Sequence, residues 1–100
     1  MLDALSYEEL AAQVGMKFAV TDAHAPLTLE LAEITERRAT ERQEYFSLIF
    51  RGAREFILPQ RIYQLEHEQL GASVLFLVPV GATADSAEYE AAFNRLIGDG

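Results

Sequence analysis

The chain has 100 residues, no cysteine and a formal net charge of −8. This length suits a single domain, residues 1–100, with one modest hydrophobic core. The composition excludes disulfides and thiolate chemistry. Its acidity argues against a nucleic-acid partner, because an acidic surface repels phosphates.

A membrane location and secretion are also disfavoured. No apolar run approaches the roughly 20 residues that a membrane helix needs. The start of the chain, Met1-Leu2-Asp3-Ala4, lacks the basic and apolar regions of a secretory signal. We therefore expect a cytoplasmic protein that does not contact a membrane.

The first predicted element is a short helix over residues 7–14. Ser6 and Glu9 have the spacing of a capping box, in which each side chain bonds the backbone amide of the other residue. The helical period places Leu10 and Val14 on its inner face. Because a helix of two turns is not stable alone, we expect it to pack on a sheet.

Two alternating segments follow and predict a pair of strands. The first, residues 16–21, alternates apolar and more polar residues. Its expected inner face consists of Met16, Phe18 and Val20. A turn over residues 22–26 separates it from residues 27–34, where leucines alternate with polar residues. The alternation slips at Ala32-Glu33, which predicts a β-bulge there.

The most polar stretch, residues 36–44, mixes acids and bases without glycine or proline. It is typical of a solvated loop, although a strand extension or a hairpin tip is also compatible. Residues 45–51 then predict a strand that Gly52 ends. Its two faces carry Phe46, Leu48 and Phe50 on one side and Tyr45, Ser47 and Ile49 on the other.

The longest uninterrupted apolar run, residues 74–80, predicts the most buried strand of the domain. Residues 62–67 alternate before it, and the short turn between them predicts an antiparallel hairpin. Because proline donates no backbone hydrogen bond, the strand must end, bulge or lie at an unpaired amide near Pro79.

The last segment, residues 86–97, fits both a strand and a helix. A strand would turn one face inward through Tyr89, Ala91 and Phe93. A helix would do so through Tyr89, Ala92, Phe93 and Leu96. We favour a strand because it would form a second hairpin with the apolar run.

These elements predict a mainly β fold. Five to six sequential strands with short connections indicate an antiparallel meander. A sheet of that length curls into a small barrel or folds into a sandwich, here with one short N-terminal helix.

Several fragments of this chain carry a family resemblance. They are Phe46-Ser47-Leu48-Ile49-Phe50-Arg51-Gly52, Leu58-Pro59-Gln60, Tyr63-Gln64-Leu65-Glu66-His67, Leu70-Gly71, Leu75-Phe76-Leu77-Val78-Pro79-Val80-Gly81 and Tyr89-Glu90-Ala91-Ala92-Phe93-Asn94. Together they resemble DUF6916, a family of small bacterial domains of unknown function, over about residues 5–95. The family has no catalytic residues to carry over. Some members are encoded beside phage-tail-collar-like proteins, so the resemblance implies an accessory or structural role.

One position departs from the family pattern. Arg61 follows Leu58-Pro59-Gln60, where the family has a glycine. This puts a turn with φ > 0 at that position in doubt.

Catalytic signals are weak. His67 lies between Glu66 and Glu68, and carboxylates can orient a histidine as a general base. The alternative is a histidine at a strand end, bonded to the turn backbone. His24 lies in a proline-containing turn and is expected to be solvated.

Metal and nucleophile motifs are missing from the sequence. The spacing of the two histidines does not resemble a metal site. The strand serines, Ser47 and Ser73, lack the Gly-x-Ser-x-Gly motif of a serine nucleophile. We therefore predict no metal, no cofactor and no catalytic residue.

Surface residues are better candidates. Arg51 and Arg54 could clamp a carboxylate of a partner, or pair with Glu55 and acids on neighbouring strands. Outer apolar residues of two strands would form an exposed patch if they meet, which is typical of an interface; alternatively, both faces of their strands are covered. The expected interaction residues are Tyr45, Ile49, Arg51, Arg54, Ile62 and His67.

Three classes of function remain. The first is a non-enzymatic structural or protein-interaction module that binds a partner, or itself, through a strand edge or outer apolar residues. The partner would belong to a phage-tail-like or surface-fibre assembly, on the strength of the resemblance. The second is a small-ligand or carbohydrate-binding barrel, with a cavity lined by Tyr63, Phe76 and Phe93. The third is an acidic inhibitor or immunity-type protein, steered electrostatically to a basic enzyme.

Overall fold

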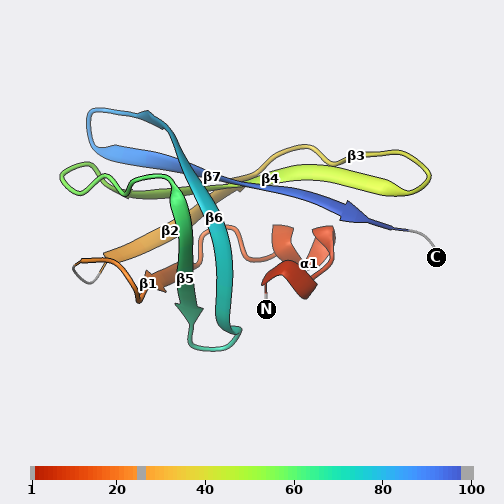
Figure 1. Cartoon of the computed structure of the whole chain (residues 1–100), viewed down its shortest axis with the longest axis horizontal. Helices are drawn as coiled ribbons and strands as arrows, with labels where there is room; N and C mark the ends of the chain where they lie inside the picture. Colours follow the sequence, from red (N-terminus) through yellow and green to blue (C-terminus); the bar gives the residue numbers. More distant parts are fainter. Residues whose placement is uncertain (1, 25–26, 98–100) are drawn as a thin grey trace.

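Strands dominate the computed structural model, which describes residues 2–24 and 27–97 (Figure 1). A 3-10 turn, η1 (Leu2–Ala4), precedes the helix α1 (Tyr7–Ala11). The strands are β1 (Lys17–Val20), β2 (Leu27–Ile34), β3 (Arg38–Ala39), β4 (Gln43–Ala53), β5 (Arg61–His67), β6 (Gly71–Ala82) and β7 (Ser86–Leu96). The predicted mainly β fold with a short N-terminal helix is confirmed.

Six of these strands close into an antiparallel barrel. Around the barrel the order is β1, β2, β4, β7, β6 and β5, and β5 returns to β1. The short strand β3 pairs with the start of β4 and lies outside the ring. Barrel closure was one of the two predicted outcomes, and it leaves no room for a sandwich.

The predicted simple meander is wrong. The ring consists of two three-stranded units, β1-β2-β4 and β5-β6-β7, each built from sequential hairpins. Residues 54–60, which we call the crossing loop, carry the chain from β4 to β5 across one end of the barrel. The long ladder between β4 and β7 then joins the units. Local hydrophobic patterns specify the hairpins, but they do not determine which units pair with each other.

The N-terminal segment closes the opposite end. Ser6 and Glu9 make both bonds of the predicted capping box. Leu2 and Leu10 are completely buried. The prediction that Val14 faces the core is wrong: its side chain is exposed because α1 already ends at Ala11.

The pair β1 and β2 follows the predicted pattern closely. Phe18 and Val20 are buried, whereas Met16 precedes β1 and is exposed, contrary to prediction. The register between β2 and β4 shifts between Leu31 and Glu33, which confirms the predicted bulge. The turn predicted at residues 22–26 falls partly outside the described residues.

Strand β4 runs further than predicted in both directions. It passes through Gly52 and ends at Ala53, so the expected stop at Gly52 is wrong. A Cβ atom at Gly52 would lie 2.5 Å from Cδ2 of Leu29. The absence of a side chain at Gly52 therefore leaves room for the core side chain of Leu29. At the other end, β3 and β4 form a hairpin within the polar stretch that was expected to be a solvated loop.

Strand β6 is not the most buried strand, contrary to prediction. Its inward residues Leu75 and Leu77 are buried, but Val74, Phe76 and Val80 are 62%, 49% and 50% exposed. The barrel wall is one sheet thick and the outer side of β6 is not covered, so continuous apolarity does not produce burial on both faces. The predicted hairpin with β5 is confirmed.

The C-terminal segment is a strand, as favoured, and the helical alternative is wrong. Strand β7 pairs with β4 on one side and with the last part of β6 on the other. The β6–β7 register shifts between Pro79 and Gly81, so the irregularity expected near Pro79 is present.

Candidate functional site

His67 is held by the turn that follows β5. Its Nδ1 accepts hydrogen bonds from the backbone amides of Gln69 and Leu70, at 3.1 and 3.2 Å. Its ring lies 5.1 Å from that of Phe18. This is the second of the two roles expected for His67, in which the imidazole caps a turn.

The other candidates for chemistry are likewise engaged or isolated. Oγ of Ser73 accepts from the amide of Leu2 at 2.7 Å, and Oγ of Ser47 donates to Glu90 at 2.5 Å. His24 is exposed. Within the described residues, no three acidic or histidine side chains gather closely enough to hold a metal ion. No described helix has the length and apolar character that crossing a membrane requires.

A buried carboxylate that sequence reasoning missed lies at the N-terminal end of β4. Glu44 binds Nε of Arg37 at 2.5 Å and Nη2 of Arg95 at 2.8 Å. The hydrogen bond from Arg37, and then those from Arg95, hold the pKa of Glu44 below its ordinary value, although burial opposes this effect. The polar run around Glu44 concealed it, because only the pairing of β4 with β7 brings Arg95 close.

The arginine candidates are bound within the chain. Arg51 forms an ion pair with Glu88 of β7 at 3.0 Å. Arg54 donates to the backbone carbonyl of Thr83. Arg51 therefore pairs with an acid on a neighbouring strand, one of the alternatives expected from the sequence, and neither guanidinium extends unpaired toward a partner.

The outer apolar residues that would form a patch if they met do not all lie together. Tyr45 and Ile49 lie on β4, whereas Ile62 lies on β5. These strands are not neighbours in the barrel. Ile49 is only partly exposed, between Glu33 and Glu90 on the adjacent strands. The order of strands, which the sequence pattern does not encode, therefore separates the residues.

Ile62 instead has apolar neighbours on β6. It is the direct cross-strand partner of Phe76, and Val74 precedes Phe76 on the same outer side. The three side chains are 57%, 49% and 62% exposed. We call Ile62, Val74 and Phe76 the β5–β6 outer face. In Figure 1 the β5–β6 hairpin descends away from the long strands β4 and β7.

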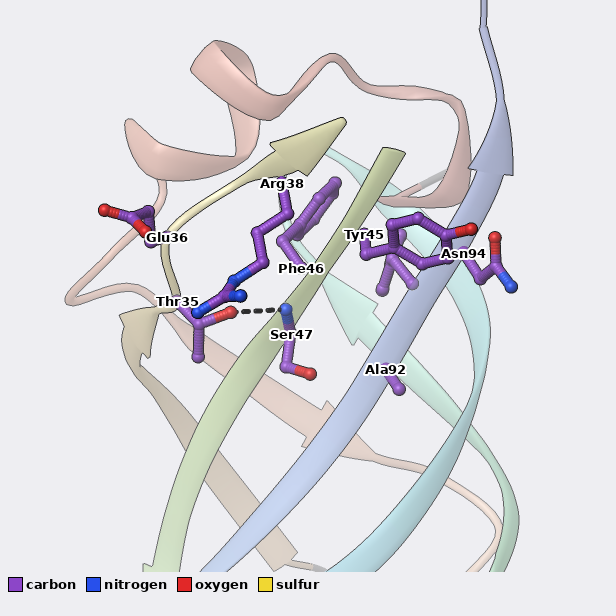
Figure 2. Close-up of a pocket in the computed structure, with 9 residues that line it drawn as sticks. Thr35, Glu36, Arg38, Tyr45, Phe46, Ser47, Ala92 and Asn94 are labelled. Atoms are coloured by element: carbon purple, nitrogen blue, oxygen red, sulfur yellow. Dashed lines mark hydrogen bonds between the residues drawn. The ribbon is translucent and has the colours of Figure 1, made fainter. Parts of the chain in front are cut away.

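A second surface feature, shown in Figure 2, is a pocket of about 350 Å³ on the outer side of β4 and β7. Thr35 accepts a hydrogen bond from the amide of Ser47 at 2.7 Å, and Arg38 lies beside it, while Asn94 lies on the opposite side near Tyr45. The hydroxyl of Ser47 is bound to Glu90. The pocket therefore presents mixed polar groups, including the Glu36 carboxylate, and its serine hydroxyl is already engaged.

The internal cavity required by the ligand-binding hypothesis is not formed by the expected residues. Tyr63 and Phe93 point into the barrel and are buried. Phe76 points outward on the β5–β6 outer face. The three side chains cannot line one cavity, because alternation along β6 directs Phe76 to solvent.

Comparison with known proteins identifies a family over most of the chain. The model of DUF6916, described as a domain of unknown function, matches residues 5–93. No curated protein and no solved structure gives a significant match. Arg61 stands where the family has a glycine, and its backbone does not adopt the φ > 0 conformation that glycine favours. No described residue other than glycine has a positive φ.

Proposed function

Since the chain belongs to the DUF6916 family, whose function is unknown, we propose from its own surface that it is a non-enzymatic protein-interaction module. The observation that carries this proposal is the β5–β6 outer face. Ile62 and Phe76 pair across two strands with more than two fifths of each side chain exposed, and Val74 extends the apolar surface.

This surface differs from the usual outer side of a barrel in water. The next outward positions of β5 carry the polar residues Gln64 and Glu66. Single exposed apolar residues are common, but adjacent ones that include an aromatic ring mark an interface. Burying such a group against a partner supplies the apolar centre of a protein–protein contact.

Charge indicates the chemistry of the partner. The chain carries 16 acidic and 8 basic residues. Three acids, Asp22, Glu44 and Glu88, already bind four of the seven arginines. The remaining surface has excess negative charge, so two copies repel each other, whereas a partner with lysine and arginine around an apolar centre is attracted.

The partner that we propose is therefore a basic protein with an exposed apolar patch. The family resemblance directs the search to phage-tail-like or surface-fibre assemblies. If the partner is a basic enzyme that loses activity in the complex, the protein is an acidic inhibitor, the second candidate that the charge favours.

To test this proposal, a photo-crosslinking amino acid is introduced at position 76 of the protein, which is then expressed in the cell of origin. A matched variant carries the same amino acid at position 56. A crosslinked protein is then purified and its binding measured by light scattering and surface plasmon resonance. We expect Phe76→Ser to weaken binding at least tenfold and Phe56→Ser to leave it unchanged. Association should also slow as salt rises from about 50 to 200 mM, because the Debye length shortens.

Two results would contradict the proposal. One is that position 76 yields no crosslink and the purified protein forms no complex with any basic protein tested. The other is a complex whose affinity is unaffected by Phe76→Ser. If the protein instead forms a dimer that Phe76→Ser abolishes, the partner of this face is a second copy of the chain and not a basic protein.

A further inference from the structure

The crossing loop presents two consecutive apolar side chains to solvent. Leu58 points inward and is buried at the end of the barrel. Phe56 and Ile57, just before it, are 59% and 56% exposed. This second apolar surface lies on a different segment from the β5–β6 outer face.

Two buried tyrosines fix the backbone of this loop. The hydroxyl of Tyr89 accepts from the amide of Leu58 at 2.9 Å and donates to the carbonyl of Phe56 at 3.3 Å. The hydroxyl of Tyr63 donates to the carbonyl of Pro59 at 2.5 Å. These bonds from the barrel interior hold the loop backbone in one conformation. A ligand therefore does not have to pay the entropy cost of ordering the loop when it binds.

The loop forms one wall of a pocket of about 380 Å³. Ala23, His24 and Leu27, around the start of β2, also line it. Tyr63 also lines the pocket and is completely buried. This volume lies near the lower end of the range of about 300–1,000 Å³ for small-molecule sites.

Apart from the exposed His24, the polar side chains that line the pocket are already engaged. Arg61 binds the carboxylate of Asp22 at 3.1 Å, and its guanidinium lies 4.2 Å from the centre of the Tyr63 ring. Burial raises the pKa of the Tyr63 hydroxyl, which therefore stays protonated as a hydrogen-bond donor. The described residues contain no buried side-chain polar atom without a partner. A charged ligand would lose hydration, and the walls offer it little compensation beyond the exposed His24 imidazole.

We propose that this pocket binds a small, uncharged, largely aromatic molecule, with Phe56 and Ile57 covering its exposed side. An aromatic ligand suits the rim because a ring can stack on or meet the edge of Phe56. The site shares no residue with the β5–β6 outer face, so either proposal can fail without the other.

The probe for the test is N-phenyl-1-naphthylamine, an uncharged dye that becomes fluorescent in apolar sites. We expect saturable binding at one site per chain, with amide shifts at Ala23, Leu58 and Tyr63 in two-dimensional NMR spectra. Phe56→Ser and the pocket-filling variant Ala23→Leu should each weaken it at least tenfold. Phe76→Ser is the matched control and should leave it unchanged, while circular dichroism verifies that each variant folds.

Three results would overturn the proposal. The first is no saturable binding by the folded wild-type protein. The second is binding that Phe76→Ser abolishes and Phe56→Ser does not, which would place the dye on the β5–β6 outer face. The third is loss of a protein complex, without loss of dye binding, in Phe56→Ser, which would make Phe56 an anchor for a partner protein.

Discussion

Arg95 extends from β7 to the carboxylate of Glu44 on β4, with Nη2 2.8 Å and Nε 3.0 Å from the same oxygen. Nη1 of the same guanidinium donates to the carbonyl of Leu5 at 2.7 Å. The guanidinium also lies 5.1 Å from the ring centre of Phe46. One side chain therefore links two barrel strands to the N-terminal segment.

We expect Glu44→Gln to lower the free energy of unfolding by about 1.5–3 kcal/mol at pH 7, the usual contribution of hydrogen bonds to charged groups. The substitution preserves shape but removes the charge that holds Arg37 and Arg95. Urea denaturation measures the change. Glu41→Gln, at an exposed position of the same hairpin, is the matched control and should change stability by less than about 0.5 kcal/mol.

The same carboxylate should make stability depend on pH. The pKa of Glu44 in the folded protein is below its ordinary value of 4.5. As pH falls below that value, the unfolded chain takes up a proton at Glu44 before the folded chain does, so unfolding is favoured. The contribution of Glu44 is complete above pH 4.5 and is lost as pH falls through the lowered pKa.

Unfolding curves between neutral and acidic pH test this dependence. The difference in stability between the wild type and Glu44→Gln should be largest at pH 7 and shrink in acid. A difference that stays constant as pH falls would show that Glu44 does not carry the effect.

Gly52→Ala should destabilise the barrel by about 1–3 kcal/mol, since it inserts a methyl group into a packed core. The new Cβ would lie 2.5 Å from Cδ2 of Leu29, a residue that is buried. Gly81→Ala is the control, because a Cβ there meets no atom within 4 Å. In a double-mutant cycle with Leu29→Val, the two costs should be less than additive; simple additivity would exclude the clash as the cause.

Tyr89→Phe should cost about 1–3 kcal/mol, because it leaves the buried amide of Leu58 without an acceptor. Hydrogen exchange at that amide should accelerate together with the loss of stability. Tyr45→Phe removes an exposed hydroxyl bonded only to Gln43 and should have little effect. Equal exchange at Leu58 in the wild type and Tyr89→Phe would show that the loop does not depend on this bond.

Much of the fold could be read from local pattern. The capping box at Ser6, the bulge near Glu33 and the irregularity at Pro79 each express a rule that acts over a few residues, and each is present. Alternation likewise separated the two faces of β4, and Phe46, Leu48 and Phe50 are all buried. These features depend on the chain itself more than on its distant neighbours.

The candidate surfaces could not be predicted in the same way. The order of strands separated Ile62 from Ile49 and placed it beside Phe76. The hydrophobicity of residues 74–80 does not reveal whether a second layer covers the strand. In the sequence, Glu44 belongs to a polar stretch that resembles a solvated loop. Only the pairing of β4 with β7 places it beside Arg95. Each error arose where a tertiary contact, and not a local pattern, decided the environment.

The division of the ring into two three-stranded units has a consequence for folding kinetics. Hairpins within each unit join segments that are close in sequence and can form early. The β4–β7 ladder, from Gln43 with Leu96 to Ala53 with Ser86, joins segments that are far apart. Chain entropy must be lost before this ladder gains its contacts, which slows folding. We therefore expect formation of the β4–β7 ladder to be the rate-limiting step of refolding.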